Sequence, residues 1–325
     1  MNEPDVQSVE EAVEAFLAHK RGIGRKFVSE EHELSLLVAF ADGYGIGRLA
    51  ELTPRIVEEF LGSRPRSTPR SFNHLLSALA GLFDWAISHE LLEGSPLRVA
   101  RRRTTSRRVP FLFGIEEARR LVDVAGALSD NPRARDRGPT YRSIFALSYG
   151  LGLRAGEVCG LRLSDVDVDR QLLVVRGGKF GKSRLVPHGP RVAALVDEQV
   201  ARRRAAGATA SDAPLFSFDG TRPVHPGTAS LTFHHLVPVL GLVVPNGVAP
   251  PTLHSLRHSF AVGCLLRWYR EGLDPQSRLH QLSTFMGHVD PVSTAVYLTI
   301  TPELLTEANQ RYEAFAQAAF LEARP

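Results

Sequence analysis

Apolar residues recur at helical spacing through the first hundred residues and predict four helices. Ser8 with Glu11 forms a capping box at the start of the first helix, and Ser29 opens the second. Thr53 followed by Pro54 begins the third, and the fourth ends at a Gly-Ser-Pro stretch. The apolar faces of the four helices include Val13, Phe16, Leu34, Leu37, Val57, Phe60, Leu75, Leu79 and Leu82.

The rest of the chain mixes helical periodicity with two short β-branched runs, 171–176 and 183–187. A glycine-rich turn joins these runs and predicts a β-hairpin. Thr140 stands where it could cap a helix over 141–149. Further helices are expected over 115–127, 190–205, 228–240, 255–270, 278–285, 291–297 and 302–320. The fold class predicted is therefore mainly α with a small β-sheet (α+β).

The stretch 98–110 lacks apolar periodicity and reads as an arginine-rich linker between a helical domain, 1–97, and a second domain, 111–325. Residues 1–97 carry nine Lys/Arg and fifteen Asp/Glu, whereas the remaining residues carry thirty and twenty. A basic segment suits a polyanion, because each neutralised phosphate releases counterions. The residues predicted to contact DNA are Arg98, Arg101, Arg102, Arg103, Arg107, Arg108 and, farther along the chain, Lys182.

Composition argues against a membrane or secreted protein. The chain has no apolar run of membrane-spanning length and no signal peptide pattern, so we expect it to be cytoplasmic. Cys159 and Cys264 both lie in apolar helical stretches. They are interpreted as buried thiols and not as a disulfide framework or a zinc site.

Polar residues at three places stand out against apolar surroundings. Arg154 follows an apolar helix end, and Glu157 three residues later could form a structural ion pair with it. His254, Arg257 and His258 share one helical face. Two histidines at this spacing could bind a metal, but the arginine between them would repel a cation, so an anion site fits better.

The third place is the segment MGHVDPVSTAVY, in which His288 follows a helix end and Tyr297 lies nine residues later. A tyrosine taken alone is most often a half-buried packing residue. Because Tyr297 follows the Arg154 and His254–His258 motifs in the chain, it is considered together with them and not alone.

The motifs GLRAGEVCGL, HSLRHSFA and MGHVDPVSTAVY together resemble the tyrosine recombinase family, also called the phage integrase family, over about residues 110–300. The N-terminal helices resemble the family's core-binding domain in size and position. The resemblance implies that Tyr297 attacks a DNA phosphodiester and forms a 3′-phosphotyrosyl bond. It also implies that no metal or other cofactor takes part.

The resemblance also implies roles for the other residues. Arg154 and Arg257 would clamp the phosphate, and His254 would take the proton of Tyr297. The general acid would be Lys179 on the hairpin turn, with Lys182 as the second choice. His288 would donate to a non-bridging oxygen, Glu157 would orient Arg154, and His258 would be structural.

The expected partner is double-stranded DNA, bound by a homo-oligomer, a tetramer on paired sites, or by an assembly with related recombinases. Integration, excision or transposition of a mobile element would be the outcome. We expect Arg64, Arg66 and Arg70 to gather on one DNA-facing side of the first domain. Two other functions remain open: DNA relaxation of the type IB topoisomerase kind, and non-catalytic DNA binding.

Overall fold

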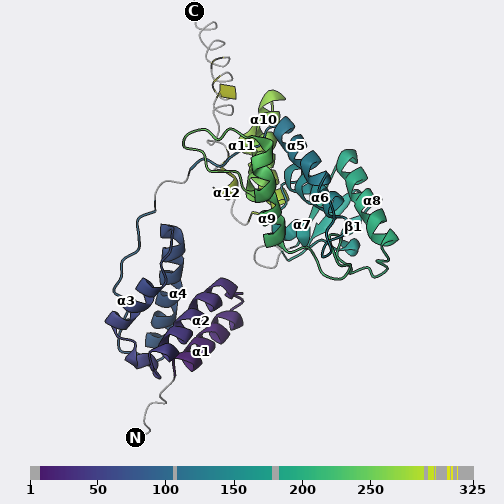
Figure 1. The fold of residues 1–325 in the computed structure, drawn as a ribbon. Coiled ribbons are helices and arrows are strands. Elements are labelled where there is room, and N and C mark those ends of the chain that lie inside the picture. The colour runs from purple at the N-terminus through teal and green to yellow at the C-terminus, as the bar shows by residue number, and fades with distance from the viewer. Residues whose placement is uncertain are drawn as a thin grey trace, which may run out of the picture. The chain divides into compact units, whose positions relative to one another are not determined.

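The computed structural model describes residues 8–104, 108–177, 183–288, 292–295, 297, 306–307, 309 and 313. The chain divides into two compact units, Met1–Arg107 and Arg108–Pro325. The first unit is helical and the second combines helices with a small antiparallel sheet (Figure 1). The predicted fold class, mainly α with a small β-sheet, is confirmed.

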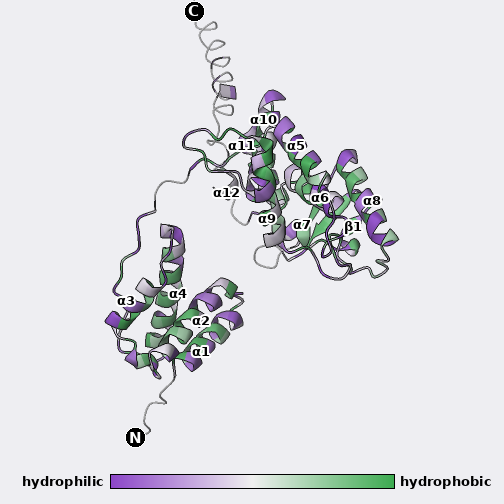
Figure 2. Cartoon of the chain, viewed as in Figure 1, coloured by the Kyte–Doolittle hydropathy of each residue, from purple (hydrophilic) through white to green (hydrophobic). Residues whose placement is uncertain are grey.

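The first unit holds the four predicted helices around one apolar core. They are α1 (Val9–Gly22), α2 (Val28–Gly43), α3 (Pro54–Ser63) and α4 (Pro69–Ser88), with a 3₁₀ turn, η1 (Leu49–Glu51), before α3. The longest of these helices, α4, shows green turns between polar ends in Figure 2, because it buries apolar side chains from Phe72 to Ala86. Those side chains include Phe72, Leu75, Leu76, Leu79, Leu82 and Phe83.

Local capping chemistry sets most of these helix ends. The Ser8 hydroxyl accepts from the Glu11 amide, and the Glu11 carboxylate accepts from the Ser8 amide, so the predicted capping box is present. Thr53 caps α3 with Pro54 at its first position, also as predicted. The start of α2 was predicted one residue late: the helix begins at Val28, after Phe27 in a left-handed conformation (φ 49°).

Part of the arginine-rich segment packs on α4. The side chain of Asn73 accepts from the amide of Arg102 and donates to its carbonyl, both at 2.8 Å. The Arg102 guanidinium stacks 3.8 Å from the centre of the Phe72 ring. Arg101 donates to the Ser77 hydroxyl at 3.1 Å. Residues 101–102 are therefore bound to α4 by both backbone and side chains.

One of the arginines expected to face DNA has an internal partner. Arg66 forms an ion pair with Glu33, whose side chain is nearly buried. The charge of Arg66 is therefore balanced within the first unit. The expectation that Arg64 and Arg70 share a DNA-facing side with it stays a prediction.

The second unit packs its helices around the buried helix α6 (Arg137–Gly150), which contacts α5 (Ile115–Gly126), α8 (Pro190–Ala205) and α10 (Leu253–Arg270). The outer helix α8 shows long purple stretches in Figure 2, as a solvent-facing helix should. The remaining elements are α7 (Ala155–Cys159), η2 (Leu163–Asp165), α9 (Pro226–Leu236), η4 (Val237–Leu240), α11 (Pro275–Met286) and α12 (Val292–Ala295).

The sheet is antiparallel, in the order β1 (Val166–Asp167), β2 (Leu172–Val175) and β3 (Arg184–Pro187). Leu173 pairs with Val186 and Val175 pairs with Arg184. Because side chains alternate along a strand, Arg184 lies on the same face of β3 as the buried Val186. The predicted hairpin strands are present, and the two-residue strand β1 was not foreseen.

In the second unit, α6 and α11 begin three or more residues before their predicted starts, and α9 and α10 begin two residues early. Helix α6 begins at Arg137, and Thr140, the predicted cap, lies inside it with 1% of its surface exposed. The Asp130 carboxylate from the preceding loop accepts from the amides of Asp136 and Arg137, each at 3.0 Å, and so takes over the capping role. Helix α11 begins earlier than predicted because Asp274 caps it ahead of Pro275.

Both cysteines are buried free thiols, as predicted. Burial raises the pKa of Cys159 to about 12. Among the helices that the structure describes, none combines the length and apolar character needed to span a bilayer.

Gly152 shapes the connection between α6 and α7. Its φ of +61° favours glycine, and a Cβ there would collide with the Phe260 ring from α10. The Gly152 carbonyl also accepts from Arg257. Only a residue without a side chain allows α10 to approach this connection so closely.

We therefore expect Gly152→Ala to lower the free energy of unfolding by about 2–4 kcal/mol, through left-handed strain and overpacking. Gly150→Ala is the matched control, because its Cβ would meet nothing closer than Val192 at 3.7 Å. The control should stay within about 1 kcal/mol of the parent. Urea unfolding midpoints measure both variants, and equal midpoints would contradict this account of Gly152.

Candidate active site

Arg154 and Glu157 lie at the start of the short helix α7. Arg154 occupies the N-cap position, and its amide donates to Glu157 Oε2 at 3.0 Å. Its guanidinium donates to Glu157 Oε1 at 2.6 Å. The ion pair considered from the sequence is thus present, and it fixes the Arg154 side chain at the end of α7.

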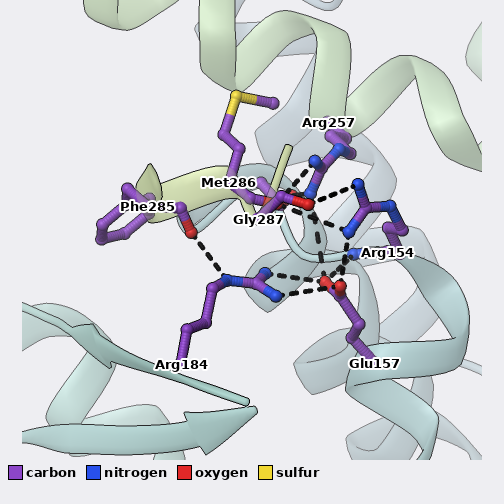
Figure 3. Close-up of polar contacts among 8 residues, drawn as sticks. Arg154, Glu157, Arg184, Arg257, Phe285, Met286 and Gly287 are labelled. Atoms are coloured by element: carbon purple, nitrogen blue, oxygen red, sulfur yellow. Dashed lines mark hydrogen bonds and ion pairs between the residues drawn. The ribbon is translucent and has the colours of Figure 1, made fainter. Parts of the chain in front are cut away.

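The Glu157 carboxylate also binds an arginine from the sheet. Arg184 donates to Oε1 at 3.0 Å and to Oε2 at 2.9 Å, and Glu157 is 7% exposed (Figure 3). Burial acts to raise the pKa of Glu157, but hydrogen bonds from Arg184 and Arg154 outweigh it and hold the pKa at about 2. The carboxylate is therefore ionised at neutral pH.

Arg257 is the most deeply buried charged residue of the site, with 1% of its surface exposed. It extends from α10 and donates to the Gly152 carbonyl and, at 2.7 Å, to the Met286 carbonyl. Its nearest carboxylate oxygen, Glu157 Oε2, is 4.0 Å away. Burial, together with the charge of Arg154, lowers the pKa of Arg257 to about 10, so it remains protonated at neutral pH.

The three arginines meet at the C-terminal end of α11. Arg184 donates to the Phe285 carbonyl at 2.8 Å, and Arg154 donates to the Gly287 carbonyl at 3.0 Å (Figure 3). Together with the bond from Arg257 to Met286, these contacts supply donors to carbonyls that a helix end leaves unpaired. Cations also suit this end of the helix dipole.

Gly287 turns the chain out of α11 with a φ of +67°. His288 follows, and its Nδ1 lies 2.7 Å from the hydroxyl of Thr294, a fully buried residue of α12. Burial and the nearby Arg257 and Arg154 lower the pKa of His288 to about 4. His288 is thus a neutral imidazole at physiological pH.

Tyr297 is 4% exposed and lies against α10. Its hydroxyl is 2.8 Å from Nδ1 of His258, and its ring lies roughly parallel to that of His288, with centres 6.4 Å apart. Burial raises the pKa of Tyr297, and the charges of Arg257 and Arg154 partly offset that effect. The phenol therefore needs a proton acceptor to become a nucleophile near neutral pH.

The histidine that meets the phenol is not the one expected. The family resemblance implies the proton-accepting role for His254 and a structural role for His258, yet it is His258 that contacts the Tyr297 hydroxyl. His254 lies one turn earlier on α10, with its ring centre 4.6 Å from that of His258. Burial and then Arg257 lower the pKa of His254.

The remaining predicted residues fall into two groups. Arg98, Arg101, Arg102, Arg103 and Arg108 are exposed. Lys179, Lys182 and Arg107 lie outside the described residues. Among the residues that the structure describes, there is no cluster of three or more His, Cys, Asp or Glu that could hold a metal.

Arg184 was missed by the sequence analysis. The available signal was an arginine within a β-branched run, directly after the glycine-rich hairpin turn. On its own this signal does not separate a solvent-exposed strand residue from a buried ion-pair partner.

Comparisons with known proteins bear on the whole chain. The family model described as "Phage integrase family" matches residues 116–303. A putative integrase/recombinase, y4rB, of Sinorhizobium fredii is 34% identical over 93% of this chain and 96% of its own length. Tyrosine recombinase XerC of Xanthomonas campestris is 28% identical over 90% of this chain and 85% of its own length.

Among solved structures, the Tn1549 transposon integrase in complex with a circular intermediate DNA superposes with a TM-score of 0.62. It covers 93% of this chain and 99% of that one at 17% identity. At this identity the likeness concerns the fold. The match extends across both compact units of the chain.

The low pKa of His288 predicts how stability changes with pH. A histidine whose pKa is lowered from 6.5 to about 4 by folding contributes stability that is complete above about pH 6.5 and is lost as the pH falls toward 4. His288→Gln should therefore lose less stability over this window than the parent. His254, shifted in the same direction, should retain part of the slope.

Denaturant midpoints measured from pH 7 to pH 4 test this expectation. His280→Gln is the matched control, because His280 is exposed on α11 and should leave the slope unchanged. The low pKa of Glu157 acts in a separate and more acidic window, between about pH 4.5 and 2. Identical slopes for His288→Gln and the parent would contradict the neutral, buried state of His288.

Proposed function

The chain belongs to the phage integrase family and is a tyrosine recombinase, and on this premise we propose that Tyr297 is the nucleophile with which it cuts and rejoins DNA. Its function is site-specific DNA recombination. The observation that carries the proposal is the hydrogen bond between the Tyr297 hydroxyl and His258 beside Arg154 and Arg257.

In the proposed reaction the Tyr297 oxygen attacks the phosphorus of a DNA phosphodiester. A bond forms between the tyrosine and the 3′ phosphate, and the bond to the 5′ oxygen breaks. The phenol loses a proton and the departing 5′ oxygen gains one. Because the bond energy is kept in the phosphotyrosyl link, a 5′ hydroxyl from another strand can reverse the step without ATP.

Arg154 and Arg257 would stabilise the charge that develops on the non-bridging oxygens. Both are held by carbonyls at the end of α11, so their guanidinium groups are positioned before DNA arrives. A guanidinium has several N–H donors in one plane and can keep these contacts while binding phosphate. Loss of one such donor typically slows a reaction about a hundredfold to a thousandfold.

The histidines would divide the remaining work. His258 would accept the proton of Tyr297, which places the base one helical turn after His254. The Thr294 hydroxyl can donate to Nδ1 of neutral His288, which leaves its Nε2–H to donate to a non-bridging oxygen. Lys179 on the hairpin turn, with Lys182 as the second choice, would protonate the leaving 5′ oxygen.

The helical first unit and the exposed arginines of 98–108 would bind the duplex backbone. Exchange between two duplexes requires each broken strand to have its own tyrosine. We therefore propose a tetramer on paired sites, formed by this chain alone or with related recombinases. Transposition is the biological outcome suggested by the resemblance in fold to a transposon integrase. No metal or other cofactor enters the proposed steps.

Covalent trapping tests the nucleophile. The probe is a library of singly nicked duplexes tiled across the DNA that flanks the protein's own gene, incubated with the full chain in EDTA. The parent should give a protease-sensitive, slowly migrating DNA adduct. Tyr297→Phe should give none, because the ring without its hydroxyl cannot form the phosphotyrosyl bond.

A Tyr269→Phe variant is the matched control, since Tyr269 is also on the second unit but lies outside the proposed site. It should form the adduct as the parent does. An adduct with Tyr297→Phe would move the nucleophile elsewhere, and loss of the parent's adduct in EDTA would contradict the metal-independent step.

The choice of base is tested on the best duplex from that library. His258→Asn should slow single-turnover cleavage at neutral pH by about a hundredfold or more, since general base catalysis is typically worth that much. The defect should shrink as the pH rises toward the pKa of the phenol, because Tyr297 then ionises without help. His254→Asn should show a defect that does not shrink with pH. The reverse pattern would return the role of base to His254.

A further inference from the structure

Arg184 lies outside the set of residues to which the family resemblance gives a role. It begins β3, just after the hairpin turn, and its side chain points away from solvent with 12% of its surface exposed. A buried guanidinium is costly to desolvate unless every contact is matched. The contacts that Arg184 makes therefore call for a functional explanation.

Those contacts bring three parts of the site together. Both terminal nitrogens of Arg184 bind the two oxygens of Glu157, and Nε donates to the Phe285 carbonyl at the end of α11 (Figure 3). This is the paired, in-plane geometry that makes arginine–carboxylate contacts strong and specific. A Cβ at Gly287 would come within 2.6 Å of Arg184 Nη1, so the close approach of the two segments also depends on that glycine.

The charges around Glu157 explain what this contact does. The Arg154 guanidinium binds only Oε1 of the carboxylate, at 2.6 Å, while its amide donates to Oε2, and the Arg257 guanidinium stays 4.0 Å from Oε2. Arg184 alone engages both oxygens through its side chain. Without Arg184, the Glu157 carboxylate would be neutralised by Arg154 and Arg257 alone, and these are the two groups proposed to hold the phosphate. A carboxylate and a phosphate would then compete for the same donors.

We propose that Arg184 is a positioning residue whose charge balances Glu157, so that Arg154 and Arg257 remain available to the scissile phosphate. The inference rests on the proposed function of those two arginines. It gives Glu157 two separate partners: Arg154, which the carboxylate orients, and Arg184, which neutralises it. The effect of removing Arg184 should consequently depend on whether Glu157 still carries a charge.

The test uses single-turnover cleavage of the best nicked duplex at saturating full-length protein. Arg184→Gln should lower the cleavage rate constant about a hundredfold, the typical effect of losing one preorganised donor. Arg184→Lys keeps the charge and should stay within about tenfold of the parent. The double variant Glu157→Gln/Arg184→Gln should cleave within about threefold of Glu157→Gln, because no carboxylate is left to compete.

Binding is measured separately on the same duplex with Tyr297→Phe added to each variant. The dissociation constant should change less than about fivefold, because the active-site phosphate is one among many that the protein contacts. Arg170→Gln removes an exposed arginine beside the same sheet and should leave both quantities unchanged. Thermal melting shows which variants are folded.

A purely architectural role for Arg184 predicts different results. Arg184→Lys would then be as slow as Arg184→Gln, and the double variant would be slower than either single variant. Either result, or a folded Arg184→Gln variant that cleaves at the parent's rate, would overturn the proposal. If Arg184→Gln does not fold, the comparison of the double variant with Glu157→Gln still decides.

Failure of this inference is distinguishable from failure of the proposed function. The adduct that depends on Tyr297 reports the function and does not require Arg184 to have any particular role. A Tyr297-dependent adduct together with an unaffected Arg184→Gln variant would leave the nucleophile in place and reject only the balancing role.

Discussion

The candidate active site is built around one buried carboxylate, that of Glu157. Glu157 ends up in a nearly dry environment, which is tolerable only because guanidinium groups from α7 and β3 bind it directly and a third from α10 lies nearby. Each of these arginines comes from a different part of the chain. The carboxylate therefore fixes the relative positions of a helix start, a strand and a long helix. A mismatch in any of them would leave a charge without its counter-charge in the interior.

The same arginines complete the end of α11, and this links the site to the segment that carries the proposed nucleophile. Carbonyls at a helix end need donors, and here three successive carbonyls receive them from Arg184, Arg257 and Arg154. His288 leaves the helix directly after this point and Tyr297 follows nine residues later. The arginines proposed to bind phosphate and the proposed nucleophile thus share one structural support. A reaction that requires the tyrosine and the arginines in fixed relative positions is accelerated by this arrangement, because the positions are set before the substrate binds.

The sequence predicted best what local chemistry decides. Caps at Ser8 and Thr53, the hairpin strands and the order of the helices all follow from signals within a few residues. Thr140 failed as a cap because the helix starts three residues earlier, at Arg137, where Asp130 from the preceding loop accepts from the amides of Asp136 and Arg137. Family resemblance pointed to Arg154 and Arg257, but Arg184 binds a carboxylate 27 residues away, and its local sequence does not distinguish a buried ion-pair partner from an exposed strand residue. The sequence also could not show that His258, and not His254, contacts the Tyr297 hydroxyl, for a similar reason. The two histidines share one face of α10, and only the tertiary placement of Tyr297 decides which of them the phenol meets.

The contact between Asn73 and Arg102 determines where the first unit can be joined to a different second unit in a chimeric protein. The side-chain amide of Asn73 pairs with both backbone groups of Arg102 as a neighbouring β-strand would, and the Arg102 guanidinium covers the Phe72 ring. A chimera joined after Leu97, the predicted end of the first domain, would lack Arg102. Residues of the other protein would then take its place beside Asn73 and Phe72 on α4. The segment to be transferred should therefore include the residues up to and including Arg102. A junction placed after Arg102 keeps α4 together with residues 101–102, which pack on it. The surface of the first unit would then stay unchanged in the chimera.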